Sequence, residues 1–256
     1  MNGKTVIVTG GSSGLGKAMA IKFANEGANV VITGRNAERL DIAKEEIEQL
    51  GGSVFPFQMD VRDTAQVEEM VRKTTEKFGQ IDFLVNNAAG NFVCPAEDLS
   101  YNGWKSVIDI VLNGTWYCSQ VVGKEWIAKG YKGSILNIIA TYAWGAGPGM
   151  IHSASAKAGV LAMTRTLAVE WGSKYGIRVN GIAPGPIDDT EGVARLIESQ
   201  NVHKSAMNAI PLKRFGTKEE IADLAEYLLN AKSAFINGEC ITIDGGKWLN
   251  NEQYKL

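Results

Sequence analysis

Short runs of β-branched residues alternate with longer amphipathic segments along almost the whole chain, and this alternation is the feature that most limits its fold. Several of the runs are apolar at consecutive positions, which is typical of strands covered on both faces. The runs expected to be strands are Thr5–Thr9, Asn29–Thr33, Val54–Met59, Phe83–Val85, Ser134–Ile139, Ile177–Ile182 and Cys240–Ile243. Strands that alternate with helices are parallel and are joined by right-handed crossovers. The sequence therefore predicts an α/β fold with a doubly wound parallel sheet of about seven strands.

The segments between these runs carry the signals that begin and end helices. The expected helices are Leu15–Asn25, Ala37–Leu50, Thr64–Phe78 and a segment from Thr217 to about Asn230. The first three stop just before a glycine, and Thr217 with Glu220 forms a capping box. The stretch from about Pro184 to Gly216 shows no regular pattern. Because 256 residues are close to the usual upper size of one hydrophobic core, we expect a single domain over residues 1–256.

Composition and charge exclude several classes of protein. The chain has 26 basic and 28 acidic residues and a net charge of −2, so it lacks the basic surplus of nucleic-acid binders. No apolar run is long enough to span a membrane, and Met1 leads into the first strand without an apolar signal segment. Cys94, Cys118 and Cys240 lie far apart, without metal-ligand spacing. We therefore expect a cytoplasmic protein with no metal and no nucleic-acid or membrane partner.

A glycine-rich turn, Thr9-Gly10-Gly11-Ser12-Ser13-Gly14-Leu15-Gly16, follows the first strand and precedes the first helix. Glycine lets the backbone approach a pyrophosphate, and a helix N-terminus offers free N–H groups and a positive dipole end. The spacing is G-x-x-x-G-x-G, and a tight turn without a ligand is the alternative. Three glycines between the first strand and helix of a βαβ unit favour a Rossmann-like dinucleotide site. The expected cofactor contacts here are Gly10, Ser12, Ser13, Gly14, Leu15 and Gly16.

The end of the second strand indicates which dinucleotide is bound. Its sequence is Gly34-Arg35-Asn36, whereas a chain that binds NAD usually has an Asp or Glu there for the ribose 2′-hydroxyl. Arginine suits a phosphate through planar, charge-assisted hydrogen bonds. A solvated arginine that starts the next helix is the alternative. The missing acid favours NADPH over NADH, with Arg35 on the 2′-phosphate.

The order of further motifs resembles the short-chain dehydrogenase/reductase family. The matching motifs are Thr9-Gly10-x-x-x-Gly14-x-Gly16, Asp60-Val61, Asn86-Asn87-Ala88-Ala89-Gly90, Pro184-Gly185-Pro186-Ile187, Pro211-Leu212-x-Arg214-x-Gly216 and Asp244-Gly245-Gly246. The resemblance covers almost the whole chain. It implies further cofactor contacts from Asp60, Val61, Asn87, Ala88, Lys157, Pro184, Gly185 and Ile187. It also implies a homotetramer whose main interface uses the helices around residues 104–129 and 153–172.

The chain departs from the family at the residues that perform ordinary carbonyl reduction. Family members normally carry Tyr-x-x-x-Lys, with a serine thirteen residues before the tyrosine. Lys157 is present, but Ser153 stands at the tyrosine position and Ala140 at the serine position. A serine hydroxyl is far too weak an acid to replace a phenol tuned by a nearby lysine. Reduction of ordinary ketones or 3-oxoacyl groups is therefore disfavoured.

A tyrosine just after the fifth strand, Tyr142, suggests a subfamily. The combination resembles the 2,4-dienoyl-CoA reductases, which share the runs Asn86 to Phe92, Val111 to Thr115 and Ser153 to Gly159. The resemblance implies an acyl-CoA substrate that NADPH reduces to a 3-enoyl-CoA in the oxidation of unsaturated fatty acids. We expect water to be the final proton source, at C2. The resemblance also implies that the site consists of Tyr142, Asn113, Ser153 and Lys157.

The chemistry of a conjugated thioester gives each of these residues a role. Hydride addition at C5 places negative charge on the thioester oxygen, where Tyr142 and Asn113 are suitable hydrogen-bond donors. By resemblance, Lys157 holds the ribose hydroxyls of the nicotinamide half, and Ser153 helps to fix that half. The neighbouring His152 receives no role, because a histidine without a visible partner is more often structural. Trp144, just after Tyr142, is a candidate for the wall of the acyl pocket.

Two other functions stay open from the sequence. One is a reductase of the same family that acts on a different activated alkene or on a carbonyl, such as a 3-oxoacyl thioester, with Tyr142 as its acid. The other is a cofactor-binding protein without catalysis. The presence of Lys157, Asn113 and a replacement tyrosine argues against the second.

Overall fold

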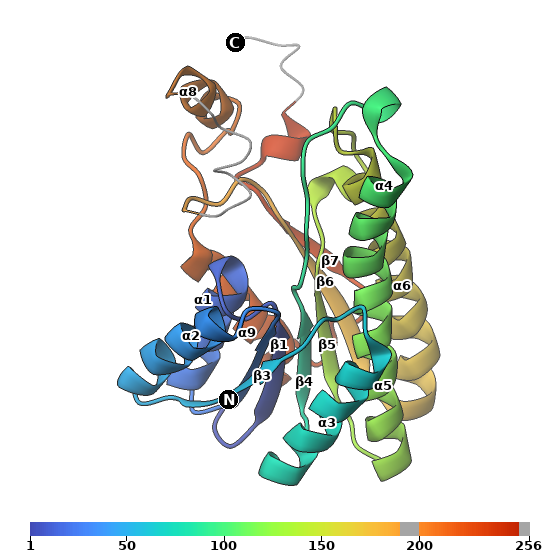
Figure 1. Cartoon of the computed structure of the whole chain (residues 1–256). Coiled ribbons are helices and arrows are strands. Elements are labelled where there is room, and N and C mark those ends of the chain that lie inside the picture. The colour runs from blue at the N-terminus through green and yellow to red at the C-terminus, as the bar shows by residue number, and fades with distance from the viewer. Residues whose placement is uncertain (190–199, 251–256) are drawn as a thin grey trace.

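The computed structural model describes residues 1–189 and 200–250, which form one α/β domain around a seven-stranded sheet (Figure 1). The strands are β1 (Thr5–Thr9), β2 (Asn29–Gly34), β3 (Ser53–Gln58), β4 (Phe83–Asn86), β5 (Ser134–Ile138), β6 (Arg178–Pro184) and β7 (Cys240–Ile243). All neighbouring strands are parallel, in the order β3-β2-β1-β4-β5-β6-β7. The predicted Rossmann-like, doubly wound architecture is confirmed.

Helices connect successive strands. They are α1 (Gly14–Asn25), α2 (Ala37–Gln49), α3 (Thr64–Phe78), α4 (Tyr101–Ile108), α5 (Gly114–Lys129), α6 (Ile151–Tyr175), α8 (Gln200–Asn208) and α9 (Lys218–Leu229). A π-helical turn, η2 (Asp109–Asn113), joins α4 to α5, and the short 3₁₀ turns are η1 (Ala96–Asp98), η3 (Thr141–Ala143), η4 (Ala231–Ser233) and η5 (Lys247–Leu249). The expected helices thus begin and end within about one residue of their predicted bounds.

Two local expectations near the C-terminal half have different outcomes. The capping box of α9 is formed: the Glu220 N–H donates to Thr217 Oγ1 at 3.2 Å, and the Thr217 N–H donates to Glu220 Oε2 at 2.9 Å. The expectation of no regular structure from Pro184 to Gly216 is wrong for α8, and residues 190–199 of that stretch lie outside the described part. The side chains of residues 204–208 are exposed or half-buried, so no strongly buried face marks this helix in the sequence.

Different helices cover the two faces of the sheet. Helices α1, α2 and α9 lie on one face, and α3, α5 and α6 lie on the other (Figure 1). Val6 and Val8 of β1 belong to the core between the sheet and helices α1, α2 and α9. Ile7, between them, belongs to the core between the sheet and helices α3, α5 and α6. Side chains alternate between the faces of a strand, so a strand buried on both faces reads as a continuous apolar run.

The topology places a crevice at one edge of the sheet. From β1 the chain moves outward through β2 and β3, and it then returns to add β4 on the other side of β1. Ligands of open α/β sheets bind at such a switch point, outside the carboxyl ends of the strands. Within residues 1–189 and 200–250, no helix is both long and apolar enough to cross a membrane.

Candidate active site

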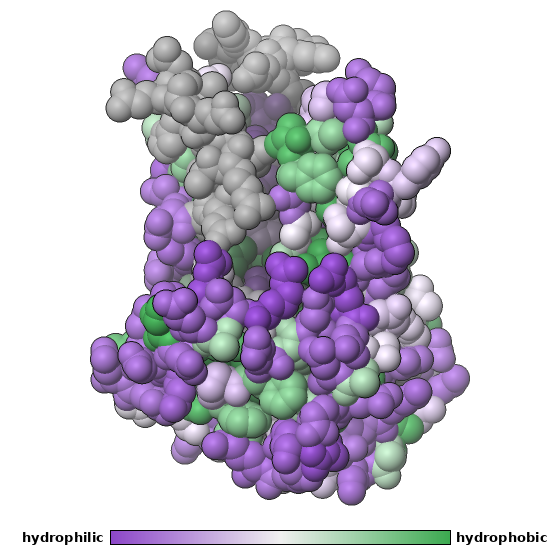
Figure 2. Space-filling model, viewed as in Figure 1, coloured by the Kyte–Doolittle hydropathy of each residue, from purple (hydrophilic) through white to green (hydrophobic). Residues whose placement is uncertain are grey.

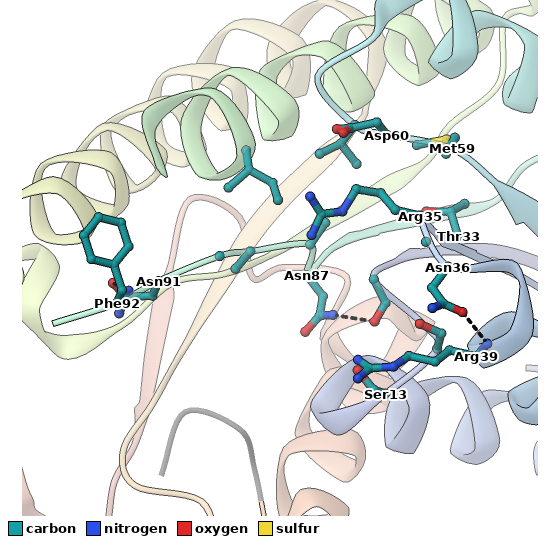
Figure 3. Close-up of a pocket in the computed structure, with 18 of the residues that line it drawn as sticks. Ser13, Thr33, Arg35, Asn36, Arg39, Met59, Asp60, Asn87, Asn91 and Phe92 are labelled. Carbon is teal, nitrogen blue, oxygen red and sulfur yellow. Dashed lines mark hydrogen bonds between the residues drawn. The ribbon is translucent and has the colours of Figure 1, made fainter. Parts of the chain in front are cut away.

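A cavity of about 870 Å³ lies at the carboxyl ends of β1, β2, β3 and β4 (Figure 3). It is lined by Gly10, Ser12, Ser13, Thr33, Gly34, Arg35, Asn36, Arg39, Met59, Asp60, Val61, Asn87, Ala88, Ala89, Gly90, Asn91, Phe92, Val93, Ile110, Tyr142 and Met150. Its size is typical of a small-molecule or cofactor site, and it lies where the strand order predicts one.

The glycine-rich turn forms one end of the cavity and is tied to the loop after β4. Gly10 has a φ of +65°, which L side chains rarely adopt, and a Cβ on Gly16 would lie 2.3 Å from the Gly10 carbonyl oxygen. Asn87 Nδ2 donates to the carbonyls of Thr9 at 3.0 Å and Gly10 at 3.2 Å. Helix α1 begins at Gly14, and the Ser13 side chain makes no cap hydrogen bond, so first-turn N–H groups are left for a ligand. This cradle fits a pyrophosphate.

Two arginines line the same part of the cavity. Figure 3 shows the Arg35 side chain extending from the end of β2 into the space between Asp60 and Asn87, and the Arg39 side chain beside Ser13. The sequence analysis did not select Arg39. Arg39 lies in the first turn of α2, after the N-cap residue Asn36, and no local signal in the sequence marks it as a cavity residue. The two side chains place two guanidinium groups beside the glycine-rich turn.

Asp60, of the Asp60-Val61 motif, carries a carboxylate that is ionised near pH 7. Asp60 accepts hydrogen bonds from Arg62 Nε at 2.9 Å and from Arg62 Nη2 at 2.5 Å. These hydrogen bonds, and more weakly the charge of Arg35, hold the pKa of Asp60 below its ordinary value.

Not every predicted cofactor residue lines the cavity. Those that do are Gly10, Ser12, Ser13, Arg35, Asp60, Val61, Asn87 and Ala88, and those that do not are Gly14, Leu15, Gly16, Lys157, Pro184, Gly185 and Ile187. Pro184 ends β6, and the Gly185 N–H donates to the Ile243 carbonyl at 2.9 Å, so both lie at the carboxyl edge of the sheet. Ile187 is buried. Cofactor contacts by both groups stay predictions.

The structure brings two of the predicted catalytic residues into contact. Tyr142, on η3, lines the cavity, and its hydroxyl lies 3.1 Å from Ser153 Oγ on α6. Lys157 follows Ser153 by one helical turn, and both side chains are buried. The Lys157 ammonium donates a hydrogen bond to the Ile138 carbonyl at the end of β5. Tyr142 therefore lies beside the position where the family normally has its tyrosine.

Burial shifts the pKa of both ionisable groups. Desolvation raises the pKa of the Tyr142 phenol, and the hydrogen bond with Ser153 opposes this only in part. The phenol therefore stays neutral near pH 7 and can donate a hydrogen bond. Desolvation lowers the pKa of Lys157 from 10.5 to about 8.

Asn113 lies on the π turn η2, which packs against α6. Its Nδ2 donates to Asp109 Oδ1 at 2.9 Å, so one of its two amide N–H groups has a partner within the protein. Asn113 is not among the residues that line the cavity, although Ile110 of the same turn is. Its predicted role as a donor to the substrate stays a prediction.

The loop after β4 and the start of α6 form an apolar wall beyond Tyr142. Phe92, Val93 and Met150 line this part of the cavity, and Figure 2 shows apolar side chains gathered along the segment between β4 and α4. The Phe92 ring packs edge to face on His152, with centroids 4.5 Å apart. His152 is fully buried, and its Nδ1 accepts the Ser153 N–H at 2.8 Å.

The predicted pocket residue Trp144 lies outside this wall. It is not among the cavity-lining residues, and its ring packs edge to face on Trp248 of η5, with centroids 5.8 Å apart. A role for Trp144 in binding the acyl chain stays a prediction.

A glycine cradle at the switch point of a doubly wound sheet, with a tyrosine and a buried lysine at the same edge, defines a dinucleotide-dependent oxidoreductase. A model of the family described as enoyl-(acyl carrier protein) reductase matches residues 10–247. The chain belongs to the short-chain dehydrogenase/reductase family.

Relatives with similar sequences and structures agree with this assignment. The chain is 58% identical over 250 residues to a probable 2,4-dienoyl-CoA reductase [(2E)-enoyl-CoA-producing] of Bacillus subtilis, covering 98% of each chain. It is 41% identical to a peroxisomal 2,4-dienoyl-CoA reductase [(3E)-enoyl-CoA-producing] of Danio rerio, covering 98% of this chain and 83% of the relative. A crystal structure of a short chain dehydrogenase from Bacillus anthracis is 61% identical, with a TM-score of 0.91 and 99% of each chain covered.

Proposed function

We propose that the protein is an NADPH-dependent 2,4-dienoyl-CoA reductase that serves the oxidation of unsaturated fatty acids. The observation that carries this proposal is the contact between Tyr142, on the cavity wall, and Ser153, which occupies the usual position of the family's tyrosine. The Bacillus subtilis and Danio rerio relatives carry the same activity in their names. A 3-oxoacyl reductase is the weaker alternative, because Ala140 supplies no hydroxyl partner for a carbonyl oxygen.

The electrostatics of Tyr142 suit an oxyanion better than an acid. A bound NADPH supplies a hydride, which this reaction adds at C5 of the conjugated thioester. The charge that develops on the thioester oxygen needs donors aimed at it, and a phenol with a raised pKa donates a hydrogen bond while keeping its proton. The second amide N–H of Asn113 is the partner donor in this proposal. Tyr142 and Asn113 together would hold the negative charge until the substrate carbon is protonated.

The residues around the cavity support NADPH as the cofactor. Arg35 stands where an NAD-binding chain usually has an acid, and Arg39 adds a second planar cation to the same cavity. Guanidinium groups bind phosphate in a charge-assisted, bidentate manner. Of the three N–H groups of the Lys157 ammonium, one is used by the Ile138 carbonyl, which leaves two for the ribose hydroxyls of the nicotinamide half.

The position of the product double bond is a separate part of the proposal. Protonation of the dienolate at C2 gives a 3-enoyl-CoA, and protonation at C4 gives a 2-enoyl-CoA. The names of the two relatives differ on this point. We propose that water protonates C2. The raised pKa of Tyr142 supports this, since it disfavours proton donation by the phenol.

The test is NADPH oxidation measured with a 2,4-dienoyl-CoA, a 2-enoyl-CoA and a 3-oxoacyl thioester side by side. We expect turnover of the dienoyl-CoA alone, and a 3-enoyl product by NMR. Tyr142→Phe removes only the hydroxyl, so kcat on the dienoyl-CoA should fall about 10²-fold while the Kd for NADPH is unchanged. Preferential turnover of the 3-oxoacyl thioester would refute the proposed substrate class, and a near-normal kcat of Tyr142→Phe would remove Tyr142 from the mechanism.

The proposal includes a homotetramer in which the helices around residues 104–129 and 153–172 form the main contact between subunits. Sedimentation velocity of the purified protein tests it, with a monomer as the contradicting result.

A further inference from the structure

The π turn that carries Asn113 also carries a carboxylate that contacts the Asn113 amide. Asp109 is the first residue of this turn, and its Oδ1 accepts the N–H of Asn113 Nδ2 at 2.9 Å. The other oxygen of Asp109 accepts a hydrogen bond from the ammonium of Lys105, four residues earlier on α4. Turns of π-helix occur frequently at functional sites, because they change the direction of a few side chains within a helix.

A second cation faces Asp109 from the segment after β3. The positive charge of Arg62 helps to hold the pKa of Asp109 below its ordinary value, after the larger effects of the hydrogen bonds from Lys105 and Asn113. Arg62 is in turn bonded to Asp60, which lines the cavity. The segment after β3 packs closely against the start of α5. A Cβ added to Gly114 would lie only 2.6 Å from Val61 Cγ2. Arg62 thus links the cavity residue Asp60 electrostatically to Asp109.

An ionised carboxylate can only accept hydrogen bonds, and this fixes the Asn113 amide in one of its two orientations. If the amide were rotated by 180°, its carbonyl oxygen would face the Asp109 carboxylate, and the hydrogen bond would be replaced by repulsion. Lys105 and Arg62 offset the charge of Asp109, so the carboxylate can orient the amide without placing uncompensated negative charge beside the site.

We propose that Asp109 is a positioning residue, which fixes the side-chain amide of Asn113 so that its remaining N–H is presented to the thioester oxygen of the substrate. This inference rests on the proposed function, in which Asn113 is one of two donors to that oxygen. A donor that is already oriented needs no rearrangement as charge develops, which is the physical basis of oxyanion stabilisation in enzymes.

The test is a double-mutant cycle between Asp109 and Asn113, followed by kcat on a 2,4-dienoyl-CoA. Asp109→Asn preserves the size of the side chain. The new amide can donate as well as accept hydrogen bonds, so it no longer fixes the orientation of the Asn113 amide. The substitution should lower kcat at least tenfold, but by no more than Asn113→Ala, whose expected loss is about 10²-fold. KM for NADPH should change less than twofold. In the Asn113→Ala background, Asp109→Asn should cause no further loss, because no amide is left to orient.

Two further variants test whether the effect depends on the charge of Asp109 and on its contact with Asn113. Asp109→Glu retains an acceptor that carries charge, so it should recover part of the activity lost in Asp109→Asn. Should Asp109→Asn fail to unfold cooperatively, Asp109→Glu alone and combined with Asn113→Ala provides the same cycle. Glu48→Gln is the matched control, since Glu48 also pairs with a lysine four residues away on an exposed helix face, on α2, outside the proposed subunit contact. It should leave kcat unchanged.

The outcomes separate this inference from the proposed function. Equal losses from Asp109→Asn with and without Asn113 would overturn the inference, as would a normal kcat for Asp109→Asn in a protein that turns over the dienoyl-CoA. Failure of the wild-type protein to reduce a dienoyl-CoA would instead refute the proposed function, before any variant of Asp109 is compared.

Discussion

Lys157 is expected to reduce the stability of the free protein, and the cost should depend on pH. Its ammonium is buried, with 7% of the residue exposed, and its pKa falls from 10.5 to about 8. Such a difference corresponds to roughly 3 kcal/mol, at about 1.4 kcal/mol for each pH unit. Below pH 8 both the folded and the unfolded chain carry the proton, so the full cost is present. Above pH 10.5 neither carries it, and the cost disappears.

The sign of the pH dependence follows from proton binding. Between pH 8 and pH 10.5 the unfolded chain binds more protons at Lys157 than the folded chain, so this group makes the free energy of unfolding rise with pH. For a pKa of about 8 in the folded state, about 2 kcal/mol of the rise falls between pH 7 and pH 9.5. Lys157→Met removes this dependence while keeping an unbranched side chain of similar length.

The assay is urea denaturation of the wild type and Lys157→Met without cofactor, at closely spaced pH values from 7 to 9.5. Other groups titrate in this range, but they are common to both proteins and cancel in the difference. Loss of the hydrogen bond to the Ile138 carbonyl costs about 1–3 kcal/mol and does not vary with pH. The difference in free energy of unfolding should therefore shift by about 2 kcal/mol in favour of the wild type as pH rises.

Lys174→Met is the control, because Lys174 lies on the same helix but is exposed and pairs with Glu170. Its difference from the wild type should stay constant over the same pH range. Parallel stability profiles for the wild type and Lys157→Met would refute the reasoning, since they would show that burial does not shift the proton equilibrium of Lys157.

Three other substitutions test the cofactor cradle and the site. Arg35→Ala should raise KM for NADPH at least tenfold while changing the weaker use of NADH little, and equal losses with both cofactors would show that Arg35 does not bind the 2′-phosphate. Gly16→Ala places a Cβ 2.3 Å from the Gly10 oxygen and 2.5 Å from Asn87 Nδ2, so we expect a loss of about 2 kcal/mol in unfolding free energy and weak NADPH binding by calorimetry. Ser153→Tyr should not create an efficient 3-oxoacyl reductase, and strong turnover of that substrate by a variant that unfolds cooperatively would contradict the proposed subfamily chemistry.

Most of the architecture could be predicted from the sequence because its signals are local. A strand covered on both faces must be apolar at successive positions, as in Thr5–Thr9, and a helix start needs a cap, as at Thr217. These patterns depend on a few neighbouring residues and on the periodicity of the backbone. The glycine-rich turn after the first strand is also a local signal, because the sequence shows directly which residues lack a Cβ.

The arrangement of the site could not be read in this way, because its residues come from separate elements. The sequence indicated Tyr142 and Ser153 by resemblance, but only the packing of η3 against α6 brings their hydroxyls to 3.1 Å. The pKa values of Tyr142 and Lys157 depend on how deeply the folded chain removes each group from water, which no local pattern records.

The sequence by itself thus determined the order of strands and helices along the chain, the glycine cradle and the residue types of the site. Tertiary structure alone decided that Arg39 joins Arg35 in the cavity and that the Tyr142 hydroxyl contacts Ser153. The physical reason is that the backbone periodicity of a segment acts over a few residues, whereas charge, burial and hydrogen-bond geometry depend on atoms that only the folded sheet brings within a few ångströms of one another.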